Sequence, residues 1–96
     1  LRMMDGVYAY NCGPAYETPA EIQSYKAQGA DIVGMSTVPE ATFAKACMMN
    51  IACISLVSNL AAGISRTPLN HTEVIAASEE AKPRMADLVD DFILRL

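Results

Sequence analysis

Short apolar segments alternate with longer amphipathic ones along this chain, and the alternation predicts strands separated by helices. Strands are expected at residues 7–10, 32–33 and 51–57. The third is an almost continuous apolar run, as in a strand buried on both faces. Helices are expected over residues 18–28 and 37–50. Strands that alternate with helices indicate an α/β fold with at least part of a parallel sheet.

A last helix is expected from residue 70 onward, after a loop at residues 58–69 that contains two breakers, Gly63 and Pro68. Its apolar side chains recur at helical spacing and form one stripe: Val74, Ala77, Ala81, Met85, Leu88 and Phe92. Pro83 lies inside the stripe and predicts a kink or a break into two pieces, since proline removes a backbone donor and crowds the preceding turn.

Three helix starts carry capping signals. Thr18 and Glu21, and Thr37 and Glu40, have the Thr-x-x-Glu spacing of a capping box, and Asn70-His71-Thr72-Glu73 is a third version. A residue able to recognise a ligand stands beside each predicted cap: Glu17, Ser36 and His71. Because crossovers between parallel strands bring such loops to one sheet edge, the three starts predict a single shared site.

Each candidate also has a plain structural interpretation. Glu17 can serve the helix dipole or accept a ligand N–H, and Ser36 can contribute to a partial phosphate site, although no Walker loop surrounds it. Asn59 can be a turn residue or a donor and acceptor at a strand end. His71 can be an exposed surface residue, and one histidine supports no catalytic triad. Met35 can line a pocket.

Composition narrows the function classes. The chain has 96 residues, 52% of them hydrophobic and 19% charged, which predicts a piece of a larger protein or a subunit interface. Its net charge of −4 disfavours nucleic acid as a partner, because duplex binding needs clustered basic residues. No apolar window reaches the roughly 18 residues of a membrane span, and no signal peptide is visible.

Three cysteines, Cys12, Cys47 and Cys53, form no C-x-x-C pair, and the only histidine is distant in sequence. No metal site is therefore expected. An odd cysteine count fits reduced thiols and a cytoplasmic location. Cys53 lies within an apolar run and is expected in the core.

Three motifs together resemble the trimeric purine nucleoside phosphorylases. They are Gly-Pro-Ala-Tyr-Glu-Thr at residues 13–18, Gly-Ala-Asp-Ile-Val-Gly-Met-Ser-Thr-Val-Pro-Glu at residues 29–40, and Asn-His-Thr-Glu at residues 70–73. The resemblance spans almost the whole chain and corresponds to the C-terminal third of such an enzyme. It implies that residues 1–96 are the C-terminal portion of one domain, a phosphorylase/hydrolase-like mixed-sheet α/β sandwich.

The resemblance implies phosphorolysis of a purine nucleoside to the free base and a pentose 1-phosphate. Glu17 would bind the N1–H side of the purine ring. Asn59 would pair near O6 and N7, and Tyr16 would pack near the base. Glu17 with Asn59 suits a 6-oxopurine, so inosine and guanosine are expected over adenosine.

The same resemblance places Met35 against base and ribose, Ser36 at the phosphate, and His71 at the 5′-hydroxyl of the sugar. Asn59, Glu17 and His71 are thus the expected catalytic group. No metal or organic cofactor is implied, since phosphate is a co-substrate, and a homotrimer is expected. The glycine-rich phosphate loop and a neighbouring subunit's aromatic would lie outside this chain, and the chain alone is expected to be inactive.

Two other functions remain open. Methylthioadenosine phosphorylases are related enzymes, but they carry Ser and Asp where this chain has Glu17 and Asn59. A non-catalytic purine-binding module that retains the fold is the alternative from another class.

Overall fold

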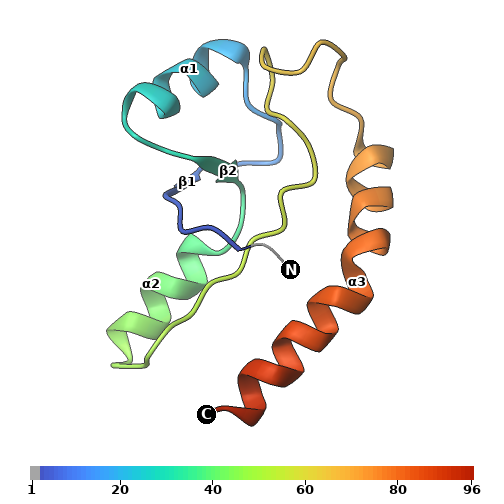
Figure 1. Ribbon diagram of the computed structural model, residues 1–96. Helices are drawn as coiled ribbons and strands as arrows, with labels where there is room; N and C mark the ends of the chain where they lie inside the picture. Colours follow the sequence, from blue (N-terminus) through green and yellow to red (C-terminus); the bar gives the residue numbers. More distant parts are fainter. Residues whose placement is uncertain (1–2) are drawn as a thin grey trace.

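A parallel strand pair with its crossover helix organises the first part of the structure, a computed structural model that describes residues 3–96 (Figure 1). The elements follow in the order β1 (Tyr8–Tyr10), α1 (Pro19–Ala27), β2 (Ile32–Gly34), α2 (Val38–Ala46) and α3 (His71–Leu94). β1 and β2 pair in parallel, with Ala9 opposite Val33. In residues 3–96 the expected α/β class is thus present as a two-stranded sheet with three helices.

Backbone and side-chain hydrogen bonds close this strand pair at both ends. The N–H of Val7 donates to the Asp31 carboxylate at 2.7 Å, and the N–H of Asp31 donates to the Val7 carbonyl at 2.9 Å. At the other end, the N–H of Asn11 donates to the Gly34 carbonyl at 2.9 Å. Residues 7–34 therefore form a closed βαβ unit.

The capping box at the start of α1 is confirmed. The Thr18 hydroxyl accepts from the N–H of Glu21 at 3.2 Å, and the Glu21 carboxylate accepts from the N–H of Thr18 at 3.0 Å. The Thr18 hydroxyl also donates to the Glu21 carboxylate at 2.9 Å. Donation from the N–H and from the hydroxyl of Thr18 holds the pKa of Glu21 below its ordinary value. Gly29, at φ +94°, gives the predicted left-handed stop. Both ends of α1 thus follow from local sequence.

The capping box predicted for Thr37 and Glu40 is wrong. Thr37 has φ +76° and accepts no capping bond; its hydroxyl lies 3.3 Å from that of Ser36 instead. This backbone differs from the extended conformation of a capping residue, which Thr18 adopts at the start of α1. The helix also ends at Ala46 rather than near residue 50. Two residues later, Met48 adopts a φ of +60°, which is not helical.

The strand predicted at residues 51–57 is absent, and these residues are an exposed extended segment. Figure 1 shows this segment, yellow-green, rising from α2 past the sheet. A strand exists only when its N–H and C=O groups meet those of a neighbour, and within the described residues β1 and β2 pair only with each other. Cys53, predicted in the core, is consequently exposed, as are Cys12 and Cys47.

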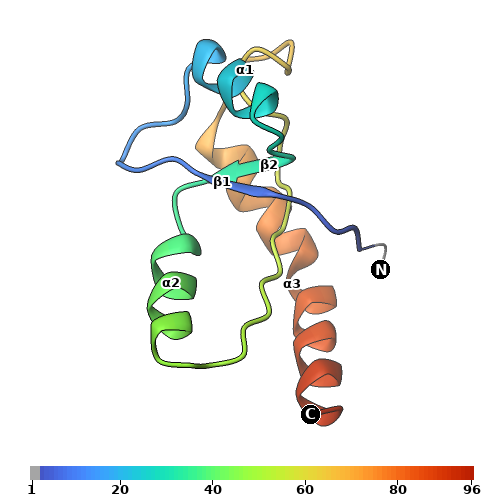
Figure 2. The ribbon, with the colours of Figure 1, turned by 90° about the vertical axis from the view of Figure 1, so that its left-hand side faces the viewer.

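α3 is one continuous helix rather than two pieces. The Asn70 side chain caps it by accepting from the N–H of Thr72 at 2.9 Å. The Glu73 side chain makes no return bond to Asn70, so the capping box expected at residues 70–73 is not formed. Pro83 lies inside it, and the axis changes direction partway along in both ribbon views (Figures 1 and 2). The expected stripe is confirmed for its first five members, which are the less exposed residues of the helix, with Ala81 buried. Its sixth member, Phe92, is exposed, so the stripe is wrong at that end.

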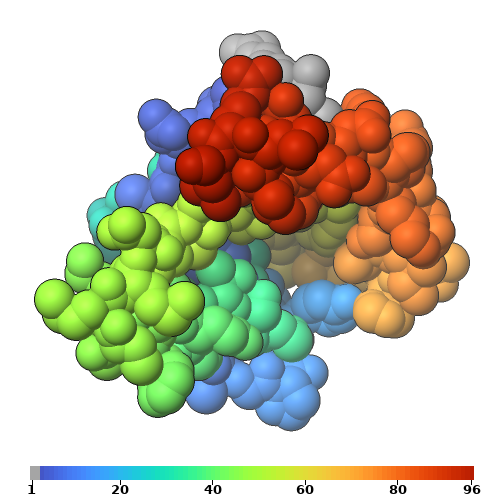
Figure 3. Space-filling model, turned by 90° about the horizontal axis from the view of Figure 1, so that it is seen from below, coloured from blue at the N-terminus to red at the C-terminus, as the bar shows by residue number. Residues whose placement is uncertain are grey.

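The molecule is open. Its radius of gyration is 14.9 Å, whereas a compact chain of this length has about 12.5 Å. Its accessible surface is 7735 Å², against about 5,400 Å² for a compact monomer of this mass. Only Ile22 and Ala81 are buried apolar residues among residues 3–96. From below, the space-filling view is hollowed between α3 and the segments coloured green to cyan (Figure 3).

Candidate functional site

One cavity of about 800 Å³ lies where the loops after β1 and β2, the segment 54–61 and the start of α3 meet. That volume is within the range of small-molecule sites. All six residues singled out from the sequence line it: Tyr16, Glu17, Met35, Ser36, Asn59 and His71. The structure therefore brings residues from three distant loops to one place; their individual roles stay predictions.

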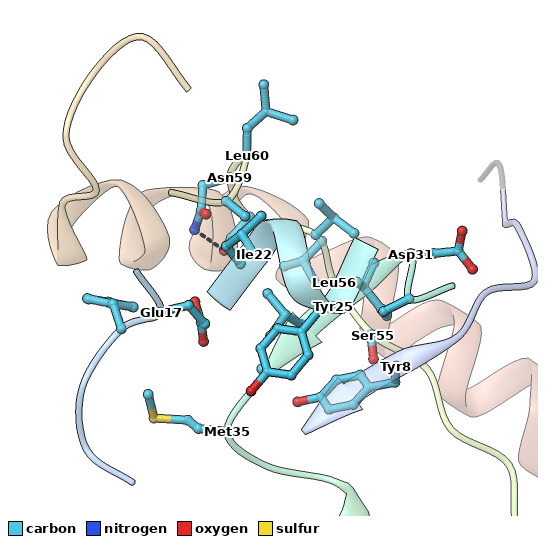
Figure 4. Close-up of a pocket in the computed structure, with 18 of the residues that line it drawn as sticks. Tyr8, Glu17, Ile22, Tyr25, Asp31, Met35, Ser55, Leu56, Asn59 and Leu60 are labelled. Carbon is cyan, nitrogen blue, oxygen red and sulfur yellow. Dashed lines mark hydrogen bonds between the residues drawn. The ribbon is translucent and has the colours of Figure 1, made fainter. Parts of the chain in front are cut away.

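Glu17 is the buried acid of the site, with 9% of its surface exposed. It directly precedes the cap residue Thr18, so the positive end of the α1 dipole lies beside it. The Asn11 amide donates to its Oε1 at 3.5 Å, and the Tyr25 hydroxyl donates to the Asn11 oxygen at 2.8 Å. In Figure 4 the oxygens of Glu17 and Tyr25 point toward the same space, with Met35 across it.

Ser36 stands between β2 and α2, where the positive end of the α2 dipole favours a polar or anionic ligand. Its own N–H donates to the Tyr8 hydroxyl at 3.3 Å. A side chain at position 34 would collide with that same hydroxyl, so Gly34 is required there. The Tyr8 ring therefore underlies the loop that carries Met35 and Ser36.

Asn59 is half-buried and reaches the cavity from the extended segment. Its amide donates to the Ser58 hydroxyl at 3.0 Å, the dashed line in Figure 4. Gly63, at φ +80°, lets the same loop pass close to Pro19, and a Cβ there would lie 2.9 Å from the proline ring. The loop is thus held against the start of α1.

His71 is the first residue of α3 and is an exposed residue of the cavity lining. Its Nδ1 lies 3.2 Å from the Tyr16 hydroxyl, across 55 residues of sequence. This bond joins the loop that carries Glu17 to the helix that carries His71.

Three further residues of the site were missed by sequence reasoning: Tyr8, Asn11 and Tyr25. Tyr25 could have been found, because it lies three residues after Ile22 and both face the cavity from α1. Asn11 follows β1 directly, but nothing in its spacing indicated Glu17 as its partner.

The assembled groups are a buried carboxylate, an amide, a phenol–imidazole pair and a hydroxyl at a helix start. They suit a ligand with N–H, carbonyl and hydroxyl groups, bound through hydrogen bonds. Within residues 3–96, no cluster of three or more His, Cys, Asp or Glu is placed to hold a metal ion. In the same residues, no helix combines the length and apolar character that a membrane crossing requires.

Comparison with known proteins identifies the family. The sequence model of the phosphorylase superfamily matches residues 1–94. A purine nucleoside phosphorylase from Cellulomonas sp. is 53% identical over 91 residues, which is 95% of this chain and 32% of that protein. Purine nucleoside phosphorylase 1 of Geobacillus stearothermophilus is 54% identical over 82 residues, covering 85% of this chain and 30% of the relative. The chain therefore spans about a third of the length of these relatives.

Solved structures agree. Schistosoma mansoni purine nucleoside phosphorylase, determined with adenosine and with inosine, superposes with a TM-score of 0.88 at 39% identity, covering 95% of this chain and 33% of that one. Two further relatives, each 44% identical, are named for narrower substrates. One, from Moorella thermoacetica, is a probable 6-oxopurine nucleoside phosphorylase; the other, from Methanothermobacter thermautotrophicus, is a probable S-methyl-5′-thioinosine phosphorylase. By sequence and by fold, this chain belongs to the phosphorylase superfamily.

Proposed function

We propose that the complete protein carrying this chain is a 6-oxopurine nucleoside phosphorylase. It would convert inosine or guanosine and phosphate to the free base and ribose 1-phosphate, and would act likewise on the deoxyribonucleosides. One observation carries the proposal: the six residues of the resemblance line a single cavity in a chain about half identical to purine nucleoside phosphorylases.

The base half of the cavity would select a 6-oxopurine. The buried Glu17 carboxylate only accepts hydrogen bonds, so it suits the N1–H of hypoxanthine or guanine and not the unprotonated N1 of adenine. The Asn59 amide can donate to N7 or O6, where negative charge develops as the glycosidic bond breaks. Preorganised donors of this type are often the largest single catalytic contribution.

The sugar half would be held by His71 at the 5′-hydroxyl, with Tyr16 and Met35 packed against base and ribose. The glycosidic electron pair passes to the purine, and a phosphate oxygen bonds to the anomeric carbon of the cationic sugar. Ser36 at the start of α2 would contribute one hydroxyl to that phosphate. This scheme uses no metal or organic cofactor, so phosphate is proposed as the only co-reactant.

Three broader predictions accompany the proposal. This chain matches about a third of the length of each relative. Residues 1–96 would therefore be one part of a larger mixed-sheet α/β sandwich. The exposed apolar surface suits coverage by further strands of the sheet and by the neighbouring subunits of a homotrimer. Three exposed free thiols suit a reducing, cytoplasmic compartment.

A second candidate follows from the Methanothermobacter relative, named for a 6-oxopurine nucleoside with a methylthio group at the 5′ position. Glu17 and Asn59 would serve that base equally well. The Tyr16–His71 pair favours inosine, because it presents polar atoms that a 5′-hydroxyl can satisfy and a thioether cannot. Methylthioadenosine is disfavoured by Glu17.

The test is phosphate-dependent release of hypoxanthine from inosine by the complete protein, with adenosine, S-methyl-5′-thioinosine and S-methyl-5′-thioadenosine in parallel. Inosine is expected to be the best substrate, and the purified 96-residue chain is expected to give no turnover. Equal efficiency with adenosine would contradict the roles of Glu17 and Asn59. Phosphate-independent purine binding without cleavage would favour the non-catalytic alternative.

A further inference from the structure

Two side chains of the loop between β1 and α1 and one side chain of α1 form a line that ends on the buried acid. The Tyr25 hydroxyl of α1 donates to Asn11 Oδ1 at 2.8 Å, and Asn11 Nδ2 donates to Glu17 Oε1 at 3.5 Å. Asn11 and Tyr25 are half-buried, and Glu17 is 9% exposed. The line is therefore partly shielded from solvent.

The chemistry of the three groups allows only one direction along the line. An ionised carboxylate accepts and never donates, so the amide nitrogen of Asn11 has to face Glu17. The amide oxygen then faces Tyr25, which must donate its proton. A flipped amide would place its oxygen against the carboxylate, which repels it, so the carboxylate sets the orientation of Asn11. The Tyr25 hydroxyl then stabilises this orientation by donating to the amide oxygen at 2.8 Å.

We infer that Tyr25 and Asn11 are positioning residues that orient the Glu17 carboxylate for a 6-oxopurine. Asn11 occupies Oε1 and limits rotation of the carboxylate about its terminal bond. The second oxygen, Oε2, is left for an N–H donor in the cavity. This inference rests on the proposed function, because it assigns Glu17 to the N1–H of the base.

The consequence is a change in substrate preference rather than a general loss. Without the relay, the carboxylate would rotate among several orientations, and the contact with N1–H would weaken in both the bound substrate and the transition state. Such a loss raises KM and leaves kcat nearly unchanged. Adenosine has no N1–H, so its phosphorolysis would depend little on how Glu17 is oriented.

The experiment compares three variants of the complete protein: Tyr25→Phe, Asn11→Asp and the control Tyr10→Phe. Tyr10 lies on β1, is half-buried and does not line the cavity. The measured quantity is kcat/KM for inosine divided by kcat/KM for adenosine. Tyr25→Phe should lower this ratio about fivefold through KM. Asn11→Asp should lower it about thirtyfold, because a carboxylate at position 11 cannot donate to Glu17 and repels it. Tyr10→Phe should leave it unchanged.

Each outcome supports or overturns the relay. A ratio within twofold of wild type in both variants would overturn it, and so would equal losses for both nucleosides, which indicate a structural defect only. A wild-type protein that releases no hypoxanthine from inosine contradicts the proposed function instead. In that case, calorimetry compares the affinities for hypoxanthine and adenine without turnover. The relay is overturned if the variants leave the preference for hypoxanthine unchanged. It is also overturned if the wild-type protein binds neither base.

Discussion

The closed βαβ unit, residues 7–34, and the segment at residues 47–69 differ in how much of their structure is held by internal bonds. The first contains a strand pair, a capped helix and the buried Ile22. The second contains no helix or strand, although residues 51–57 are the most apolar strand-like run of the sequence. A helix satisfies its own backbone, whereas a strand needs a neighbour. Strand propensity without a pairing edge therefore yields only an extended chain.

The difference divides the candidate site into two walls. Glu17 and its partners belong to the closed unit, which is bonded at both ends. Asn59 belongs to the segment, which meets α1 near Gly63. We therefore expect the base-accepting wall to be formed by local structure, and the Asn59 wall to depend on what pairs with residues 51–57.

The largest expected effect concerns this second wall. In the complete protein, amide hydrogens of residues 51–57 should exchange at least about a thousandfold more slowly than in the 96-residue chain, because a paired central strand opens only with global unfolding. Amides of β2 should change much less. Hydrogen exchange followed by mass spectrometry measures both. Equal, fast exchange of residues 51–57 in the two proteins would contradict the comparison.

Substitutions at the two walls should give different kinetic signatures. Asn59→Ala is expected to lower kcat on inosine about a hundredfold, since a donor to the departing purine acts mainly in the transition state. Glu17→Gln should act mainly through KM. Steady-state kinetics of the complete protein separate the two effects. Asn59→Asp should raise the adenosine-to-inosine ratio, and an unchanged ratio would count against the role given to Asn59.

The contact between the regions can be weakened at Gly63. Gly63→Ala combines a left-handed φ of +80° with a Cβ placed 2.9 Å from Pro19, so it should lower the free energy of unfolding by about 2–3 kcal/mol. The matched control is Gly29→Ala, at the nearer φ of +94° with open space around its Cβ, where only the backbone strain of about 1 kcal/mol is expected. Urea unfolding of the complete variants measures both. Equal losses would show that the contact adds nothing.

Capping gives the smallest expected effect. Thr18→Ala should cost about 1 kcal/mol of unfolding free energy, because the N–H of Glu21 loses its acceptor. Thr37→Ala should cost clearly less, since Thr37 makes no capping bond. Thermal unfolding compares them, and a larger loss at Thr37 would refute the assignment.

The same cap predicts a pH dependence. The folded-state pKa of Glu21 is lowered, so its contribution is complete above the unfolded value of about 4.3 and is lost as pH falls through the lowered folded value. The stability difference between wild type and Thr18→Ala should therefore shrink on acidification in that window. A constant difference at all pH values would contradict it.

The sequence by itself determined the elements that depend on neighbouring residues. Thr18, Pro19 and Gly29 define α1 through local bonding, and the loops after β1 and β2 lie where the sequence predicts them. The first five members of the stripe on α3 follow from the helical period. Tertiary structure decided what depends on distant partners. It placed Thr37 in a backbone conformation that forms no cap, left residues 51–57 unpaired, and linked Tyr16 to His71 and Tyr8 to Ser36. Those contacts join residues that no spacing along the chain identifies, because their geometry is set only when separate loops meet.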